Sequence, residues 1–303
     1  MIWKIRSGTL TFTRPLLMGI LNVTPDSFYD GGRFLKPDEA ADQARRLADQ
    51  GADLLDLGAE STRPDADPVS EEEEWNRLLP VLDEILETIR IPISIDTAKS
   101  GVARRALERG ADVINDVSGL RGDLEMAGVV KDFAAGVVLM HRRGTPKTMQ
   151  SLAQYDDVVT EVTQELRQGI EAAESNGISP EQIVVDPGIG FSKTAVQNLE
   201  VINRLADFER IGRPILIGPS RKSFIGAVIK QEPRQRLFGT IAACVLAFER
   251  GARIFRVHDV AQVKEALLVA EGILGGRHPE ATKWPKDPVR DPSSAELRSA
   301  SSG

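Results

Sequence analysis

Polar and charged side chains recur at one kind of position in this sequence, directly after short runs of apolar residues. One acid at such a position often only caps the next helix. Eight apolar runs that all end in polar or charged groups together indicate a polar pocket. Basic groups nearby, at Arg63, Lys222, Arg256 and His258, are of the types that bind phosphate oxygens, whereas Arg221 is equally compatible with an ion pair to a neighbouring acid. The polar groups that end the eight runs are Asn22, Asp56, Asp96, Asn115 with Asp116, His141, Asp186, Ser220 to Lys222, and Arg256 with His258.

The number and spacing of the histidines and cysteines limit the metals that such a pocket could hold. Of the three histidines, His141 and His258 end apolar runs and His278 lies near the C-terminus, so no pair has the spacing of a zinc site. Magnesium, held by phosphate oxygens and one or two side chains, stays open. The single cysteine, Cys244, rules out an internal disulfide and a thiolate cluster.

The apolar runs alternate with longer amphipathic segments. The runs are β-branched or leucine-rich and too short for helices, which is typical of strands buried on both faces. They cover 15–22, 52–58, 92–96, 112–116, 136–141, 182–186, 214–218 and 253–258. Helices are predicted at 38–50, 70–89, 101–109, 122–135, 157–176, 194–211, 234–250 and 260–274, and five are followed by a glycine suited to a left-handed cap: Gly51, Gly110, Gly177, Gly212 and Gly251.

Eight strand–helix alternations favour an α/β fold that closes into a (β/α)₈ TIM barrel, with its site at the carboxyl ends of the strands. A doubly wound open sheet is the competing fold, but no G-x-G-x-x-G sequence follows the first run. Residues 1–14, with the alternating TLTFT, predict a short strand or hairpin that closes the barrel floor. Residues 1–275 are thus expected to form one domain, and the polar residues 276–303 a disordered tail.

Composition excludes several classes of protein. The 303 residues are 41% hydrophobic and 27% charged, which is ordinary for a soluble globular chain. No apolar stretch reaches the roughly 20 residues of a membrane span, and the N-terminus lacks a signal-peptide layout, so we expect a cytoplasmic protein. The net charge of −7, from 45 acidic and 38 basic residues, argues against nucleic-acid binding.

Eight short motifs, in order along the chain, resemble those of the dihydropteroate synthase family, pterin-binding enzymes of the folate pathway. They are GILNVTPDSF (19–28), DLGAESTRP (56–64), SIDT (94–97), INDVSG (114–119), MH (140–141), DPGIGF (186–191), SRKSFIG (220–226) and RVHD (256–259). One such motif would be weak evidence for the family. This set, however, follows the predicted strands in order, and the resemblance extends from residue 18 to 274. The resemblance implies a (β/α)₈ transferase that joins 6-hydroxymethyl-7,8-dihydropterin diphosphate to p-aminobenzoate, giving 7,8-dihydropteroate and pyrophosphate.

The resemblance also implies a pterin pocket. A pterin presents an N–H and an amino group side by side, which one carboxylate can accept in two parallel bonds. Asp186 matches the family residue in this role, with Asn115 beside it and Lys222 donating to the ring. Asp96 is implied to stabilise positive charge that develops on the pterin. The implied apolar walls of the pocket are Met140 and Phe191, and Gly218 is the remaining implied pterin-binding residue.

For the reaction itself, the resemblance implies that Asn22 holds Mg²⁺. An arylamine is neutral at pH 7 and needs no strong base, so stabilising the departing pyrophosphate should be the largest catalytic contribution. The pterin then carries the cation that the amine captures. The diphosphate contacts implied are Thr62, Arg63, Arg256 and His258, and the catalytic residues Asp96, Lys222, Arg256 and His258.

The loops at 24–32 and 61–67 are long enough to act as lids over a p-aminobenzoate slot. Sulfonamides imitate that substrate, so the same residues should determine drug sensitivity. The chain departs from the family at Ala59 and Asp65, where glycine is usual, and at Pro219, which bears on loop mobility and inhibitor affinity. The slot implied comprises Phe28, Thr62, Arg63, Pro64, Phe191, Ser220 and Lys222.

Two alternatives share these features in part. Methyltransferases that bind methyltetrahydrofolate use a similar barrel but need no diphosphate site, and Ser61 to Pro64 with Ser220 to Ser223 favour the synthase. A non-enzymatic homologue would be expected to lack at least one implied catalytic residue, and this chain has them all. The family is dimeric, which makes the apolar face of 241–248 with the last helix the expected interface.

Overall fold

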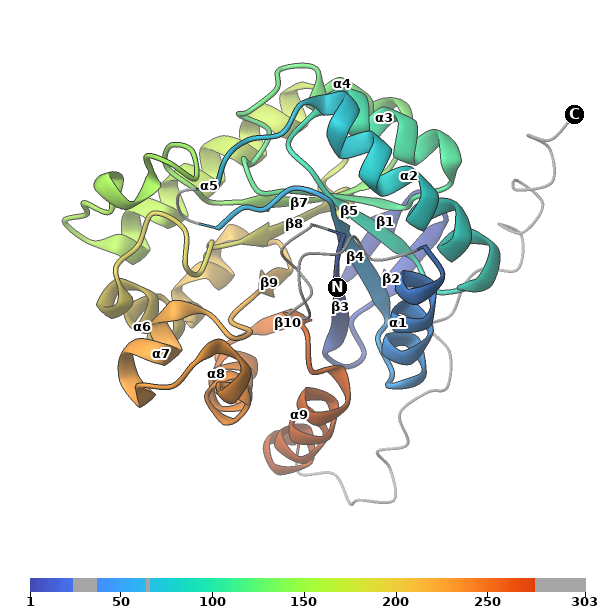
Figure 1. Ribbon diagram of the computed structural model, residues 1–303. Coiled ribbons are helices and arrows are strands. Elements are labelled where there is room, and N and C mark those ends of the chain that lie inside the picture. Colours follow the sequence, from blue (N-terminus) through green and yellow to red (C-terminus); the bar gives the residue numbers. More distant parts are fainter. Residues whose placement is uncertain (24–36, 64–65, 276–303) are drawn as a thin grey trace, which may run out of the picture.

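Short apolar strands pair in parallel and close into a barrel in the computed structural model, which describes residues 1–23, 37–63 and 66–275 (Figure 1). The last strand pairs with both the first and the penultimate one, so the barrel has no free edge. This confirms the (β/α)₈ prediction. The barrel strands are β3 (Leu16–Asn22), β4 (Leu54–Gly58), β5 (Ile93–Asp96), β6 (Val113–Asp116), β7 (Gly136–Met140), β8 (Ile183–Asp186), β9 (Ile215–Ile217) and β10 (Ala252–Val257).

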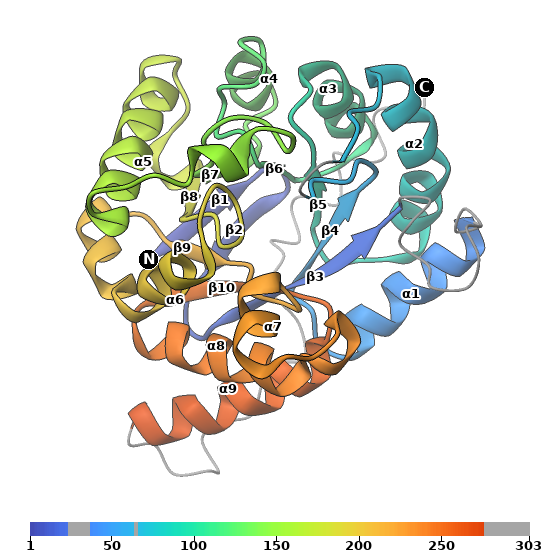
Figure 2. The ribbon, with the colours of Figure 1, turned by 60° about the vertical axis from the view of Figure 1, so that its left-hand side comes forward.

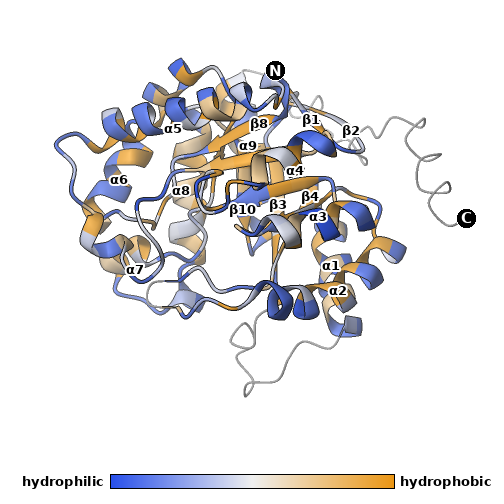
Figure 3. Cartoon of the chain, turned by 90° about the horizontal axis from the view of Figure 1, so that it is seen from above, coloured by the Kyte–Doolittle hydropathy of each residue, from blue (hydrophilic) through white to orange (hydrophobic). Residues whose placement is uncertain are grey.

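Helices surround the barrel (Figure 2). Figure 3 shows the strands as hydrophobic and the helices as two-faced, as expected when helices lie between a buried sheet and solvent. The helices are α1 (Pro37–Asp49), α2 (Glu71–Thr88), α3 (Ser100–Arg109), α4 (Met126–Asp132), α5 (Val158–Ser175), α6 (Ala195–Asn203), α7 (Ser223–Ile229), α8 (Leu237–Glu249) and α9 (Val260–Gly275). None of those within the described residues combines the length and hydrophobicity of a membrane span.

Three helical regions differ from the prediction. The helix expected at 194–211 ends with α6, and Leu205–Ile211 continues as a 3₁₀ helix. There Leu205 and Phe208 are both buried, and a spacing of three residues suits the tighter 3₁₀ turn. The sequence predicts no helix at α7, which lies between the strand predicted at 214–218 and the helix predicted at 234–250, and the helix predicted at 122–135 is reduced to the seven residues of α4. All five predicted cap glycines have left-handed backbone, with φ from 72° to 118°.

A hairpin of β1 (Ile2–Ile5) and β2 (Gly8–Thr11) closes the amino-terminal end of the barrel, as predicted. Trp3 is fully buried, and its Nε1 donates to the carbonyl of Gln182 at 2.9 Å. Trp3, Ile5 and Leu10 pack with inward residues of the barrel strands. A functional site is therefore expected at the opposite end of the barrel, where the carboxyl ends of the strands lie. Phe28, Pro64, Asp65, the expected lid at 24–32 and the expected tail at 276–303 all lie outside the described residues.

Candidate active site

The carboxylate of Asp56, on β4, connects this strand with β5, β6 and β10. Its Oδ1 accepts from Ser94 Oγ at 2.6 Å. Its Oδ2 accepts from Asn115 Nδ2 at 3.0 Å and from Arg256 Nε at 2.5 Å. Asp56 has no exposed surface, so it cannot itself bind a ligand from solvent. It holds Asn115 and Arg256 in place, a role that the sequence analysis did not assign to it.

Asp96 is the second acid of this group and has one oxygen available. Its Oδ2 accepts from Arg256 Nη2 at 2.8 Å. Its Oδ1 is buried and has no hydrogen-bond partner among the described residues. Burial raises the pKa of Asp96 to about 7, against the opposing effect of Arg256. An unsatisfied buried acceptor is costly, and a donor on a bound ligand would satisfy it.

Asp186 and Lys222 are the next two charged residues of the site. Asp186 ends β8, and Lys222 lies directly before α7. Asp186 Oδ1 accepts from the backbone N–H of Gly188 at 2.7 Å. Lys222 Nζ donates to the carbonyl of Ile189 and lies 4.7 Å from the centre of the Phe191 ring. Burial raises the pKa of Asp186 and lowers that of Lys222 to about 8. The charge of each group opposes the pKa shift of the other, so a buried acceptor and a buried donor lie near each other.

Three further residues expected at the pterin site also lie here. Met140 and Phe191 belong to one small buried apolar cluster, with Val117 and Met149. A side chain added at Gly218 would come within 3.7 Å of Arg256 Cβ and 3.8 Å of Lys222 Nζ, so this glycine leaves the space between the two cations open. The structure therefore brings together all seven residues expected around the pterin.

His258, grouped with the cations in the sequence analysis, lies near Arg256 and has a neutral imidazole ring. Its backbone N–H donates to Ser220 Oγ at 3.3 Å, and that hydroxyl is 2.9 Å from Nδ1. The O–H of Ser220 is not used by that backbone bond and can donate to Nδ1, the arrangement in which Nε2 carries the proton of the neutral ring. Burial and the charges of Arg221 and Arg256 lower the pKa of His258 to about 3. A neutral imidazole can still donate one hydrogen bond to a phosphate oxygen.

The remaining expected diphosphate residues line the same rim. Asn22 ends β3, half-buried and opposite Gly58 of β4. Arg63 is exposed, and its charge contributes to the lowered pKa of His258, so the two lie near each other. Thr62, half-buried, precedes it. Arg221 forms an ion pair with Asp259, its Nε 3.0 Å from Oδ2, as the alternative reading of this residue predicted.

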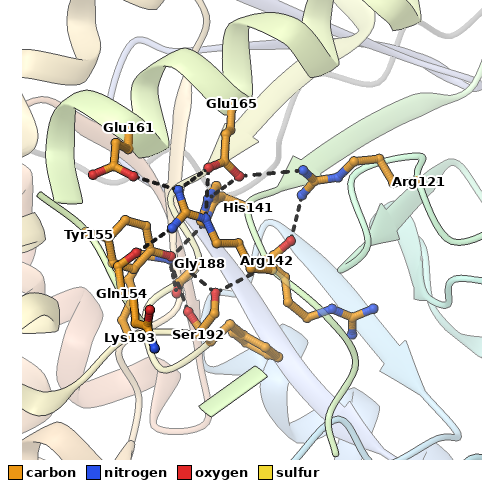
Figure 4. Close-up of polar contacts among 12 residues, drawn as sticks. Arg121, His141, Arg142, Gln154, Tyr155, Glu161, Glu165, Gly188, Ser192 and Lys193 are labelled. Atoms are coloured by element: carbon orange, nitrogen blue, oxygen red, sulfur yellow. Dashed lines mark hydrogen bonds and ion pairs between the residues drawn. The ribbon is translucent and has the colours of Figure 1, made fainter. Parts of the chain in front are cut away.

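Two of the polar strand ends do not face the pocket. Asp116 accepts from the backbone of Ser118 and Leu120, at 2.7 Å each, and so organises the turn after β6. His141 points toward α5, where its Nε2 is 3.1 Å from Glu165 Oε2 (Figure 4). On its other side lies Lys193, a buried lysine that the sequence analysis did not single out. Its only sequence signal is its place two residues after the DPGIGF motif.

Comparisons with known proteins agree with this geometry. The sequence pattern of the pterin binding enzyme family matches residues 18–258. The dihydropteroate synthase of Synechocystis is 45% identical over 261 residues, which cover 86% of this chain and 90% of that protein. The dihydropteroate synthase of Yersinia pestis, solved with a sulfonamide drug, superimposes with a TM-score of 0.87 at 38% identity, covering 91% of this chain and 100% of that one. That of Xanthomonas albilineans, in complex with 7,8-dihydropteroate, gives 0.80 at 42% identity, covering 88% and 96%.

Proposed function

Since this chain belongs to the pterin binding enzyme family, where its relatives are dihydropteroate synthases, we infer that it condenses 6-hydroxymethyl-7,8-dihydropterin diphosphate with p-aminobenzoate, a transferase reaction of folate biosynthesis. The observation that carries this is the match over nearly the whole chain to proteins of that activity. The convergence of Asp96, Asn115, Asp186, Lys222 and Arg256 at one end of the barrel supports it.

The direct test is to mix the protein with pterin diphosphate, p-aminobenzoate and Mg²⁺, and to measure pyrophosphate and dihydropteroate. Both products should form in equal amounts. If the protein instead moved a methyl group from methyltetrahydrofolate to a corrinoid protein and released no pyrophosphate, the synthase assignment would fail.

For pterin binding, we assign the recognition of the ring to the two acids on opposite sides of the pocket. Asp186 accepts the paired N–H groups of the pterin, and Asn115, fixed by Asp56, also contributes to pterin recognition. Lys222 donates to the ring carbonyl and N5. The free Oδ1 of Asp96 faces the other edge, where its negative charge stabilises the positive charge that develops as the C–O bond breaks.

For the leaving group, Arg256 is the central residue. A guanidinium has five N–H donors, and the bonds to Asp56 and Asp96 use two of them. The other three are available for diphosphate oxygens without breaking the buried ion pairs. His258 Nε2, Arg63 and Thr62 are assigned to the same diphosphate from neighbouring loops.

The pocket should work best in a narrow pH range. The mechanism needs Asp96 as the carboxylate, which forms above a pKa of about 7, and Lys222 as the ammonium, which persists below a pKa of about 8. We therefore expect kcat/KM for pterin diphosphate to peak between these values and to fall about tenfold per pH unit on either side. Lys222→Arg, which keeps its charge at high pH, should move the alkaline limit upward. A profile that is flat through both limits would contradict these protonation states.

Magnesium is the metal that the residues at this rim fit. The described residues contain no group of three or more His, Cys, Asp or Glu placed to hold a metal. The amide oxygen of Asn22 is a hard oxygen ligand of the type that Mg²⁺ accepts alongside substrate phosphates. When bound, the ion would add positive charge at the departing pyrophosphate.

Removing magnesium should therefore slow the reaction while leaving the pterin pocket intact. With excess chelator we expect turnover to fall by at least about tenfold and to return when Mg²⁺ is restored. Calorimetric affinity for the pterin alcohol, which lacks the diphosphate, should not change. Full turnover in chelator would remove the metal from the mechanism.

For p-aminobenzoate, we propose a slot beside the pterin that includes Phe191, Ser220 and Lys222, with Thr62 and Arg63 from the loop after β4. The Phe191 ring, whose centre lies 4.7 Å from the Lys222 ammonium, is the aromatic surface that we assign to the p-aminobenzoate ring. Sulfonamides, which bind the Yersinia pestis relative, are then expected to compete for this slot.

We also propose that the chain forms a homodimer through α8 and α9. These helices expose large apolar side chains, including Leu246 (45% exposed), Val269 (65%) and Ile273 (75%). Clusters of exposed apolar residues mark interfaces in soluble proteins. The double substitution Val269→Glu and Ile273→Glu should therefore produce a monomer in sedimentation experiments, whereas Leu124→Glu, at a 91% exposed position before α4, should not. A wild-type protein that is monomeric at micromolar concentration would contradict the proposal.

A further inference from the structure

Lys193 is a buried lysine outside the set of residues assigned to the substrates. Only 3% of it is exposed. Its Nζ lies 2.9 Å from His141 Nδ1, 3.2 Å from the carbonyl of Gly188 and 3.1 Å from that of Phe191. An ammonium has three N–H donors and no acceptor, and this site offers three acceptors. Burial lowers the pKa of Lys193 to about 7, whereas three acceptors within reach of its three N–H groups favour the charged form.

His141 is able to accept from Lys193 because of its own surroundings. Burial and the Lys193 charge lower the pKa of His141 to about 3, so the ring is neutral. Glu165 Oε2 lies 3.1 Å from Nε2 (Figure 4). Arg143 Nε donates to the other oxygen of this carboxylate at 2.9 Å. A carboxylate can only accept, so Nε2 carries the proton and Nδ1 presents its lone pair to Lys193.

The segment that Lys193 holds runs from Gly188 to Ser192 and contains one non-glycine residue with a strained backbone. Gly188, Gly190 and Ser192 all lie in the left-handed region, with φ of 71°, 85° and 44°. For Ser192 this conformation costs energy that surrounding contacts must offset. The contacts are polar: Arg143 N–H donates to Ser192 Oγ at 3.0 Å, and Gly190 N–H donates to Asn198 Oδ1 at 2.6 Å.

This segment decides where two pterin-binding groups lie. The carbonyl of Ile189 accepts from Lys222 Nζ, and the ring of Phe191 lies 4.7 Å from it. The N–H of Gly188 donates to Asp186 Oδ1. A side chain at Gly190 would approach Lys222 Cδ to 3.0 Å, so the backbone there is in direct contact with the lysine.

We propose that Lys193 is a positioning residue for pterin binding. Its buried ammonium, held by His141, fixes the carbonyls of Gly188 and Phe191. The segment between these carbonyls then holds Asp186 and Lys222 at the positions where they meet the pterin ring. The proposal rests on the proposed function, because it concerns the same pterin pocket. Lys193 itself does not contact the substrate.

The test compares pterin affinity with stability. Lys193→Met keeps the length of the side chain and removes all three donors. We expect its affinity for 6-hydroxymethyl-7,8-dihydropterin, measured by calorimetry, to fall about tenfold or more, the effect of losing charged hydrogen bonds. The KM for pterin diphosphate should rise by a larger factor than kcat falls, since the loss concerns ground-state binding.

The matched control is Trp3→Phe, which removes a buried hydrogen bond at the opposite end of the barrel. It should lower the melting temperature without changing pterin affinity. If Lys193→Met bound the pterin within twofold of wild type, or if Trp3→Phe weakened binding equally, the proposal would be overturned. Failure of the wild-type protein to release pyrophosphate would instead count against the proposed function.

A second pair of variants covers the case in which Lys193→Met does not fold. His141→Asn keeps an acceptor oxygen at the position of Nδ1, whereas His141→Leu offers only apolar contact to the ammonium. The Asn variant should bind the pterin nearly as wild type does, and the Leu variant should bind about tenfold more weakly. If His141 served only for packing, Leu would bind at least as well as Asn, and the positioning role would be rejected.

Discussion

Replacing Asp186 with Asn is expected to weaken pterin binding by about 100-fold or more. The Gly188 N–H already donates to one oxygen of this carboxylate. An Asn in its place would turn its oxygen toward that N–H and its NH₂ group toward the ligand. The pterin would then meet a donor where its own N–H groups need an acceptor. Two charged hydrogen bonds are lost, and a buried polar group on the ligand is left unsatisfied.

Calorimetry with the pterin alcohol measures this effect without the diphosphate. Asp53→Asn is the matched control, because Asp53 is also buried and also accepts from a backbone N–H, that of Leu17 at 2.8 Å, but lies at the barrel floor. It should reduce stability and leave pterin affinity unchanged. Affinity of the Asp186 variant within about fivefold of wild type would refute the assigned role, since even one such bond is worth more.

The sequence predicted which residues reach the mouth of the barrel, and strand periodicity explains why only some of them face inward. Side chains two residues apart share a face of a strand. Val113 and Val184 belong to the inner core of the barrel, and Asn115 and Asp186 follow them by two positions into the pocket. Asp116, one residue further than Asn115, points the other way and organises a turn.

Other features of the site could not be read from the sequence. The Arg256–Asp56 pair joins residues 200 positions apart, and the His141–Lys193 contact joins residues 52 positions apart. Periodicity fixes which face a side chain takes, but a specific pair depends on strand register and loop path. The neutral state of His258 likewise follows from burial against Ser220 and neighbouring cations, which only the fold brings together.

Arg256→Ala is expected to reduce turnover by about 10²- to 10³-fold, the range seen when one donor to a developing negative charge is removed. Binding of the pterin alcohol should fall by less, because the lost donors face the diphosphate. Steady-state kinetics and calorimetry measure the two effects separately. Equal losses for both would mean that Arg256 supports the pocket as a whole rather than the leaving group.

The same substitution has a predictable cost in stability that must be separated from its effect on turnover. It removes the partner of Asp96 and one donor to Asp56, and breaking a buried pair on one side costs about 3–5 kcal/mol of the free energy of unfolding. Adding Asp96→Asn removes the uncompensated charge, so the double variant should recover part of that stability. Turnover should stay low, because neither the diphosphate donors nor the charge facing the pterin has returned. Recovery of both together would show that the loss of turnover was a loss of folded protein.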